Sequence, residues 1–339
     1  VNLFLSPVTS LLGADPDTLA DAGAYLRIIA LGAPFIMFNN VFANVIRADG
    51  AAGQSMIANC LGTVSNIALD ALFILGFSWD VAGAAIATVL GNCVSCGYLF
   101  YYITKKQPVL SLSPKDFSLE PAVSRTVMSL GVPMACSTLL MSLSHIIANR
   151  MVIGYGSVAL AAQGVSGKIG MVITMLAMGI CMGLQPAISY NFGAGNLKRM
   201  NRIIRNTAVF TVSLGSILTL VCYLARNAII AAFIDNAEVI AYGQVFVFAS
   251  IVIGPFYGLY QLCQTFLQST GKASYASLVA LMDKGLFYLP LLFLLGKCFG
   301  LYGIIFTGAA TLFLSLAAGI LFSLIWHRKI NSPAAGSGA

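Results

Sequence analysis

Long apolar runs are the feature that most constrains this chain. An α-helix needs about 20 apolar residues to cross a bilayer, and only helices and closed barrels satisfy every backbone hydrogen bond there. Hydrophobic residues make up 59% of the sequence and charged residues 9%, well below the roughly 25% of charged residues in soluble domains. We therefore predict an all-α integral membrane protein.

The apolar runs divide into nine complete membrane helices. We expect them at residues 20–47, 53–78, 81–104, 127–154, 160–190, 203–235, 239–269, 274–297 and 299–326. The opening residues VNLFLS are typical of the last turns of a further apolar helix, so we expect the sequence to be a fragment. The small and polar tail at 331–339 is predicted to be disordered.

Charges orient the predicted bundle, because Lys and Arg concentrate on the cytoplasmic side of membrane proteins. Alternate connections carry the basic residues Arg47, Lys105, Lys106, Lys115, Arg125, Lys198, Arg199, Arg202, Arg205, Lys272, Arg328 and Lys329. The other connections carry Asp15, Asp17, Asp21, Asp80, Asp235 and Glu238, with Lys297 as the exception. This alternation predicts a cytoplasmic C-terminus. It also accounts for the net charge of +7 without a nucleic-acid partner.

Two segments of the sequence repeat one pattern, a proline followed by an apolar helix and a glycine. They are Pro34–Gly50 (PFIMFNNVFANVIRADG) and Pro255–Gly271 (PFYGLYQLCQTFLQSTG), and Gly83 and Gly303 keep nearly the same offset. Duplicated halves are common in secondary transporters. We predict a partial N-terminal lobe at 1–104, a cytoplasmic linker at 105–122 and a C-terminal six-helix lobe at 123–330.

Three segments resemble the multidrug and toxic compound extrusion (MATE) transporters. They are QPAISYNFGAGN at 185–196, LGAPFIMFNNVFANVIRADG at 31–50 and NIALDALFIL at 66–75. The resemblance implies a bundle of twelve helices in two lobes, with a cation-coupled drug cavity between them, in the bacterial cytoplasmic membrane. By that pattern, the first two helices and most of the third lie outside this sequence.

Asp70 is the strongest candidate for ion coupling, because ionisable groups inside a membrane span are costly and mark functional sites. Asn66 lies one helical turn away on the same face. Thr88 and Tyr25 are expected at a similar depth on neighbouring helices. Their oxygen atoms and the carboxyl group can hold a proton or coordinate a sodium ion, and the sequence leaves both open. The alternative is a purely structural salt bridge between Asp70 and Arg27.

The resemblance supports the coupling interpretation. Tyr25, Asn66, Asp70 and Thr88 match, in type and spacing, the N-lobe cation site of the DinF-like branch of the family, and Asn40 matches a polar residue of the cavity in that lobe. That branch also uses an aspartate on its first helix, which this sequence lacks, so we expect the site to be incomplete here. The second lobe does not repeat the site, because the offset places Leu291 opposite Asp70.

Polar and polarizable residues of the second lobe are candidates for the substrate cavity. Tyr257, Tyr260, Gln261 and Gln264 can stack on and hydrogen-bond a flat organic cation, and Met175 and Met178 belong to a methionine stripe suited to varied apolar contacts. The alternatives are interhelical packing for the first group and lipid contact for the methionines.

Asp283 and Lys284 have no assigned role. Neighbouring helical residues point about 100° apart, so the two need not pair with each other. They can compensate charges on other helices or face the cavity.

No catalytic or phosphate-binding motif is present. Without a phosphate loop, the energy for transport must come from an ion gradient or from the substrate itself. Together with the cation-coupled drug cavity that the resemblance implies, this predicts an antiporter, driven by protons or sodium ions, that exports organic cations or drugs by alternating access. We expect a monomer surrounded by lipid, with no cofactor and no metal beyond a sodium ion at Asp70. Two alternatives are a lipid-linked oligosaccharide flippase, which requires a strongly basic cavity, and a membrane scaffold or sensor, in which Asp70 serves stability rather than flux.

Overall fold

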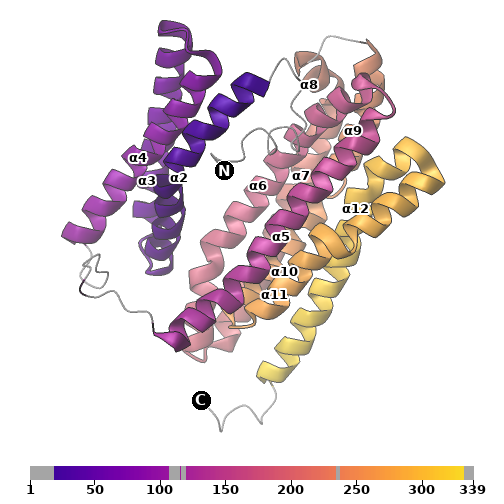
Figure 1. The fold of residues 1–339 in the computed structure, drawn as a ribbon. Helices are drawn as coiled ribbons and strands as arrows, with labels where there is room; N and C mark the ends of the chain where they lie inside the picture. The colour runs from indigo at the N-terminus through magenta and orange to yellow at the C-terminus, as the bar shows by residue number, and fades with distance from the viewer. Residues whose placement is uncertain (1–18, 107–114, 116–119, 234–236, 332–339) are drawn as a thin grey trace. The chain divides into compact units, whose positions relative to one another are not determined.

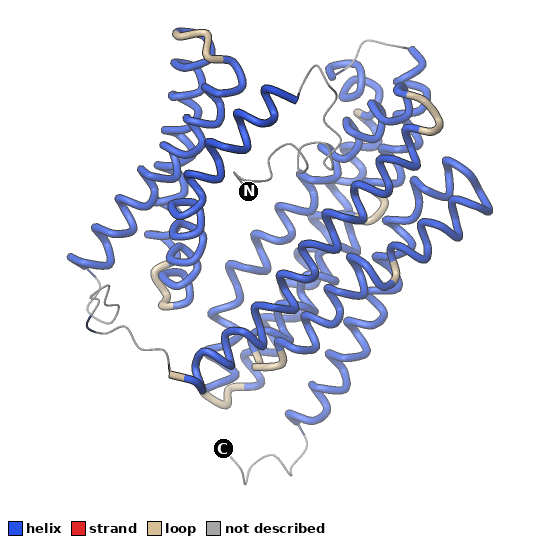
Figure 2. The backbone as a smooth tube through the Cα atoms, in the orientation of Figure 1, coloured by secondary structure: helices blue, strands red, loops and turns tan. Residues whose placement is uncertain are grey.

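A computed structural model describes residues 19–106, 115, 120–233 and 237–331 of the chain. Within these ranges the chain is helical with short connections and no strands (Figure 2). The predicted helix end at VNLFLS, the acidic residues Asp15, Asp17 and Asp235, most of the linker, and residues 332–339 of the tail lie outside them. The chain divides into two compact units, residues 1–119 and 120–339.

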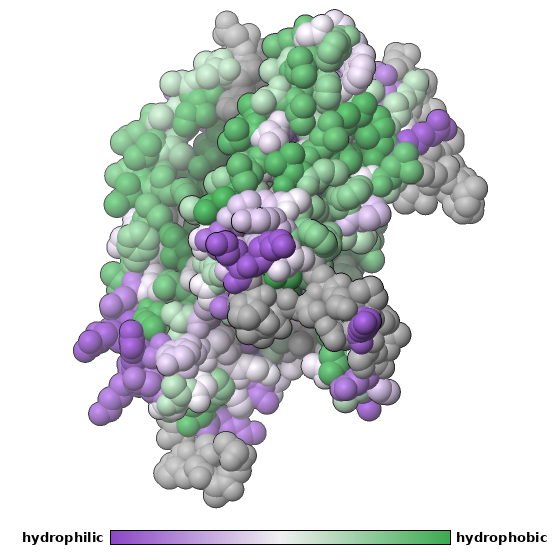
Figure 3. All heavy atoms as spheres, turned by 90° about the vertical axis from the view of Figure 1, so that its left-hand side faces the viewer, coloured by the Kyte–Doolittle hydropathy of each residue, from purple (hydrophilic) through white to green (hydrophobic). Residues whose placement is uncertain are grey.

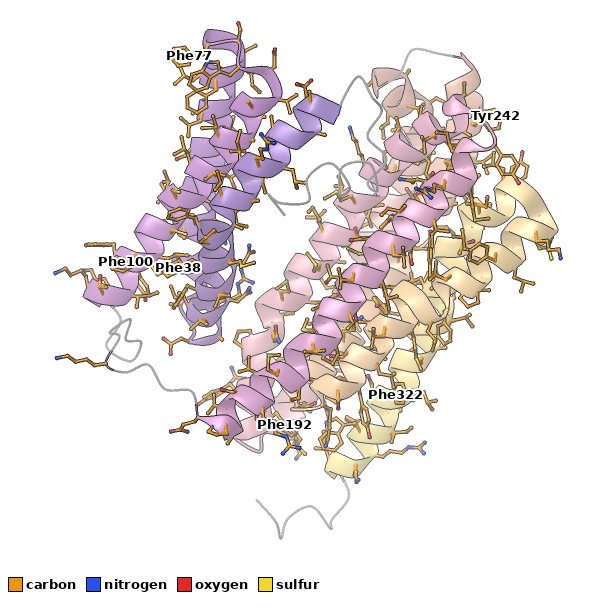
Figure 4. The ribbon with its side chains drawn as sticks, in the orientation of Figure 1. Phe38, Phe77, Phe100, Phe192, Tyr242 and Phe322 are labelled. Atoms are coloured by element: carbon orange, nitrogen blue, oxygen red, sulfur yellow. The ribbon has the colours of Figure 1, made fainter. Side chains whose placement is uncertain are left out.

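Three helices form the described part of the first unit. They are α2 (Leu19–Ala48), α3 (Ala52–Asp70), which continues as the π-helical segment η1 (Ala71–Gly76), and α4 (Asp80–Lys106). Gly50 adopts a φ of +91° in the turn between α2 and α3, a conformation that glycine tolerates without strain. At one end, the three helices bury the apolar cluster of Ala43, Ile46, Ala58, Leu99 and Ile103. Phe77 and Trp79 stack at the other end, with ring centroids 5.3 Å apart (Figure 4).

Glycines set the spacing and the register of α3 and α4. A Cβ atom at Gly91 would lie 2.7 Å from the carbonyl oxygen of Gly62 and 2.9 Å from Asn66 Cβ. Small residues permit this close approach of membrane helices. Two turns along α4, Gly83 packs against Phe73. These two contacts lie on either side of Asp70 on α3, so the antiparallel register places Asp70 beside the α4 turn that carries Thr88.

The second unit contains the remaining helices. They are α5 (Pro121–Ile153), α6 (Ser157–Gly193), α7 (Leu197–Leu224), α8 (Arg226–Phe233), α9 (Ala237–Ile251), α10 (Gly254–Ser269), α11 (Ala273–Leu281), the π-helical segment η3 (Met282–Leu286) and α12 (Tyr288–Asn331). Several buried apolar clusters hold them together. One joins α6 and α9 through Val165, Ile169 and Val247.

The segment α12 consists of two helices joined at Gly300. This glycine adopts φ 60° and ψ −135°, and the chain folds back there (Figure 1). Gly303 packs against Leu295, and Ile304 packs against Gly296. The break confirms the prediction of separate helices at 274–297 and 299–326.

Eight helical stretches in the described ranges are long and apolar enough to cross a membrane. Since the last of them, Ala273–Ile330, folds back at Gly300, they amount to nine passes. Hydrophobic residues cover most of the upper part of the face shown in Figure 3. The predicted all-α membrane class is therefore confirmed.

Two predicted helices differ from the structure. The helix predicted at 203–235 begins earlier, at Leu197, because the Asn196 side chain caps it by accepting a hydrogen bond of 3.2 Å from the Arg199 amide. The basic residues after Asn196 therefore lie on a helix rather than in a loop. That helix also ends at Leu224, before α8. The helix predicted at 239–269 is split into α9 and α10 just before Pro255, whose missing amide hydrogen cannot continue a helical ladder.

Candidate functional site

A polar pocket of about 140 Å³ lies among the three helices of the first unit. Its lining residues are Asn39, Asn59, Gly62, Thr63, Asn66, Thr88, Gly91 and Asn92. The structure thus brings together Asn66 and Thr88, two of the residues proposed from the sequence. The close approach of α3 and α4 at Gly62 and Gly91 places their polar side chains against each other.

Asparagine side chains connect α2 to α4 across the pocket. Asn39 Nδ2 donates a hydrogen bond of 3.1 Å to Asn92 Oδ1, and Ser95 Oγ donates one of 2.7 Å to Asn39 Oδ1. Asn92 Nδ2 in turn donates to the Thr88 carbonyl at 2.8 Å. This network fixes the orientation of the amides that face the pocket.

Asn40, which the sequence predicted for the substrate cavity, lies outside this pocket, whereas its neighbour Asn39 lines it. Asn40 is exposed and donates to the Ile36 carbonyl of its own helix at 2.8 Å, so it does not line this pocket. Asn39 and Asn92 were missed because only the packing of α2 on α4 shows which face of each helix turns inward. The sequence did carry a signal for these two residues. Asparagine recurs in FNNVFAN and occurs in GNCVSC, and buried polar groups in membranes need hydrogen-bond partners.

Asp70 and Asn66 each carry a buried polar atom without a hydrogen-bond partner. These atoms are Asp70 Oδ1 and Asn66 Nδ2. An unsatisfied buried polar atom costs free energy, so a donor or cation at Asp70 and an acceptor at Asn66 would be stabilised there. Asp70 also ends α3 directly before the π-helical segment η1. Such π-helical turns are frequent at functional sites.

Tyr25 and Arg27 are exposed residues of α2. Tyr25 is 39% exposed, and within the described ranges no hydrogen bond or ion pair joins either residue to Asp70. The alternative salt bridge between Arg27 and Asp70 is therefore not formed in this structure. Tyr25 as a member of the cation site stays a prediction.

The second unit contains a separate pocket of about 250 Å³ with ionisable groups. It is lined by Met141, Ser144, His145, Thr174, Ile253, Tyr257, Asp283, Lys284, Tyr288, Gly308, Thr311 and Leu312. Asp283 is 5% exposed, and its Oδ2 atom lies 2.6 Å from Lys284 Nζ. Ser144 Oγ donates a hydrogen bond of 2.7 Å to the Lys284 carbonyl, which ties η3 to α5.

The sequence left open whether Asp283 and Lys284 pair, and in the structure they pair with each other and line this pocket. The Lys284 side chain is long and flexible, so its ammonium group can fold back toward the preceding residue. A buried carboxylate without a counter-charge is strongly destabilised. The pair therefore forms within η3 itself, and no other helix has to supply a charge.

The substrate-cavity residues proposed for the second unit separate into two groups. Tyr257 lines the ionisable pocket, whereas Tyr260 is 2% exposed and packs with Val279, Leu312 and Leu316 in an apolar cluster. Gln261 and Gln264 lie on the same helix and are half-buried. Met175 and Met178 are 51% and 38% exposed. They lie away from the buried residues of α6, so they face the surroundings of the unit rather than its core.

These features define a multi-pass helical membrane protein with polar pockets inside each of its two units. A family model described as MatE matches residues 1–72 and 133–294, and the chain belongs to this family of membrane transporters, which are not enzymes. The resemblance based on QPAISYNFGAGN and its companion segments is confirmed. The DinF-like branch stays a prediction.

Two curated relatives are staphylococcal proteins. The chain is 28% identical to the multidrug export protein MepA of Staphylococcus saprophyticus over 300 residues, which is 88% of this chain and 66% of that protein. It is also 28% identical to MepA of Staphylococcus aureus (strain MSSA476) over 308 residues, 90% of this chain and 67% of that protein. The chain thus spans about two thirds of the length of these relatives.

Solved structures of MATE transporters share the fold. A transporter of the MOP superfamily from Pyrococcus furiosus superposes with a TM-score of 0.89 at 18% identity, covering 98% of this chain and 75% of that one. A variant of the Vibrio cholerae MATE transporter VcmN gives a TM-score of 0.80 at 23% identity, with coverage of 97% and 75%. At these identities the likeness shows the helical-bundle fold alone.

Proposed function

We propose that this protein exports organic cations or drugs across the bacterial cytoplasmic membrane in exchange for protons or sodium ions. The MepA relatives are named multidrug export proteins, and the family membership supports the same transport role here. The observation that carries the ion coupling is the buried carboxylate oxygen Asp70 Oδ1, which has no hydrogen-bond partner. A buried carboxylate oxygen without a partner is costly inside a membrane helix bundle and marks a functional site.

Asp70 is the proposed ion-binding group. Its carboxylate takes up a proton or a sodium ion, and either one neutralises the negative charge. The Thr88 hydroxyl donates its hydrogen to the Ala84 carbonyl at 2.9 Å, so its lone pairs remain available to a cation. Carboxylate, hydroxyl and amide oxygens are the ligands that hard cations prefer. Alternating access then loads Asp70 from one side of the membrane and releases the ion to the other.

Substrate recognition is proposed to involve the second unit. Tyr257 presents an aromatic ring at its pocket, and aromatic faces attract organic cations. Exposed Met175 and Met178 offer polarizable contacts that adapt to substrates of different shape. Gln261 and Gln264 of this unit are proposed hydrogen-bonding contacts, as is Asn40 of the first unit. Tyr260 serves this surface indirectly, because its ring lies 5.8 Å from that of Tyr257.

Transport is tested by loading cells that express the protein from its own gene with a fluorescent cationic dye. Dye efflux is recorded after a proton gradient is imposed and, in a separate experiment, after a sodium gradient is imposed. Cells that carry an empty vector are the control in both experiments. We expect faster efflux under one of the two gradients, which identifies the coupling ion. Efflux equal to the empty vector under both gradients, with the protein present in the membrane, would refute the proposed function.

A further inference from the structure

An apolar groove of about 430 Å³ opens on the second unit between α7, α10 and α12. Its lining residues are Asn201, Ile204, Arg205, Leu259, Leu262, Cys263, Phe266, Ile320, Ser323, Leu324 and His327. Ile320 and Leu324 are 41% and 52% exposed, so the groove is open along α12. It shares none of its lining with the ionisable pocket described above.

One end of the groove lies where the basic start of α7, the basic end of α12 and the end of α10 meet. The start of α7 meets the end of α12, since His327 Nε2 and Asn201 Oδ1 are 3.1 Å apart. The end of α10 joins them, because Trp326 Nε1 donates a hydrogen bond of 2.9 Å to Thr270 Oγ1. Lys272 Nζ lies 4.4 Å from the centre of the Trp326 ring. Tryptophan and basic residues gather at the membrane–water interface, so this end is at the level of the lipid headgroups.

The groove changes character along its length. Asn201 and His327 lie at the interfacial end, Arg205 follows Asn201 by one helical turn on α7, and no acidic residue of the described chain lines the groove. Leu259 and Ile320 lie deeper in their helices, about two turns or more from Ser269 at the end of α10 and from Arg328 near the end of α12. Arginine extends its charged head toward an interface while its stem covers apolar surface. The groove is thus cationic at headgroup level and apolar at the depth of the acyl chains.

We propose that this groove binds one anionic glycerophospholipid, with its phosphate on Arg205 and an acyl chain along Leu259, Leu262 and Ile320. Basic pockets between membrane helices on the cytoplasmic side are suited to anionic headgroups. Arginine forms strong, charge-assisted hydrogen bonds to phosphate. Binding of an organic cation in this groove would be unfavourable, because the positive charge of Arg205 would repel it. The bound lipid would join α7, α10 and α12 near the Asn201–His327 contact, beside the apolar cluster that includes Phe192 and Phe322 (Figure 4).

Native mass spectrometry of the purified protein in a mild detergent tests this proposal. The protein is titrated with phosphatidylglycerol and with phosphatidylcholine of the same acyl chains. Four forms are compared: the wild type, Arg205→Gln, Arg202→Gln and Ile320→Trp. Arg202 lies on the same helix with the same charge but does not line the groove, so it is the matched control. A melting curve of each form in the same detergent identifies variants that fail to fold, and Arg205→Lys replaces Arg205→Gln in that case.

We expect the wild type and Arg202→Gln to retain one phosphatidylglycerol with at least a several-fold preference over phosphatidylcholine. Arg205→Gln should lose that preference, and Arg205→Lys should keep part of it. Ile320→Trp should weaken the binding of both lipids, because the indole fills the groove. Equal losses in Arg202→Gln and Arg205→Gln would indicate a diffuse charge effect and overturn the proposal. Unchanged binding in Ile320→Trp, or displacement of the lipid by glycerol phosphate alone, would overturn it too.

Discussion

Gly91 controls how closely α3 and α4 approach at the polar pocket of the first unit. We expect Gly91→Ala to destabilise the protein by roughly 1–3 kcal/mol, the usual range for overpacking, because its Cβ would lie 2.7 Å from the Gly62 carbonyl oxygen. Gly97→Ala, on the same helix with no atom within 4 Å of the added Cβ, is the control. Melting temperatures in detergent compare the two, and equal melting temperatures would contradict the packing assigned to Gly91.

The two charges of the Asp283–Lys284 ion pair are expected to differ in what their removal costs in stability. Lys284→Met leaves a carboxylate whose side chain is only 6% exposed, whereas Asp283→Asn leaves an ammonium group on a side chain that is 36% exposed and can reach solvent. We expect Lys284→Met to lower the melting temperature more than Asp283→Asn does. The double variant should melt above Lys284→Met, because removing both charges avoids an unpaired buried one. A double variant less stable than both singles would contradict this account.

At the residue scale, the sequence predicted how deep a polar residue lies along its helix better than which face of that helix it occupies. Asn66 and Thr88 were found from their depth along apolar runs, and both line the pocket. Asn39 was missed in favour of Asn40 because the two differ only in the face of α2 that they occupy. The pairing of Lys284 with Asp283 could not be predicted from angular separation, since a flexible side chain can reach back over its own backbone.

Gly300 is the residue that divides α12 into two helices. Its φ of 60° and ψ of −135° belong to a region that residues with a side chain enter only under strain. We expect Gly300→Ala to cost roughly 1–3 kcal/mol of stability for that reason. Gly179→Ala, where an added Cβ meets no atom within 4 Å, should be tolerated. The comparison again uses melting temperatures. A tolerated Gly300→Ala would argue against the fold-back at this position.

At the element scale, the length of each apolar run predicted which segments become helices, because the bilayer imposes one minimum length on all of them. The ends were less predictable. Leu197 begins α7 within a polar segment, since the Asn196 cap and the mixed first turns let the helix extend beyond its apolar part. The π-helical segments at 71–76 and 282–286 had no composition that distinguishes them from α-helix.

At the scale of the whole molecule, the alternating charges predict the orientation in the membrane. We expect green fluorescent protein fused after the last residue to fluoresce, and alkaline phosphatase fused there to be inactive, because both results require a cytoplasmic C-terminus. The same reporters inserted at Ser78, in the connection between η1 and α4, should give the opposite results. An active phosphatase at the C-terminus would reverse the assigned topology and, with it, the side from which Asp70 is loaded.

The central claim is that Asp70 couples ion movement to export. The most direct test compares dye efflux by the wild type, Asp70→Asn and Asp80→Asn at matched abundance in the membrane and under the gradient that drives the wild type. Asp80 is an exposed carboxylate at the start of α4 in the same unit, so it controls for the loss of a negative charge. The account predicts that Asp70→Asn abolishes gradient-driven efflux while Asp80→Asn retains it. Unchanged efflux by Asp70→Asn would contradict the coupling role and leave Asp70 with a structural one.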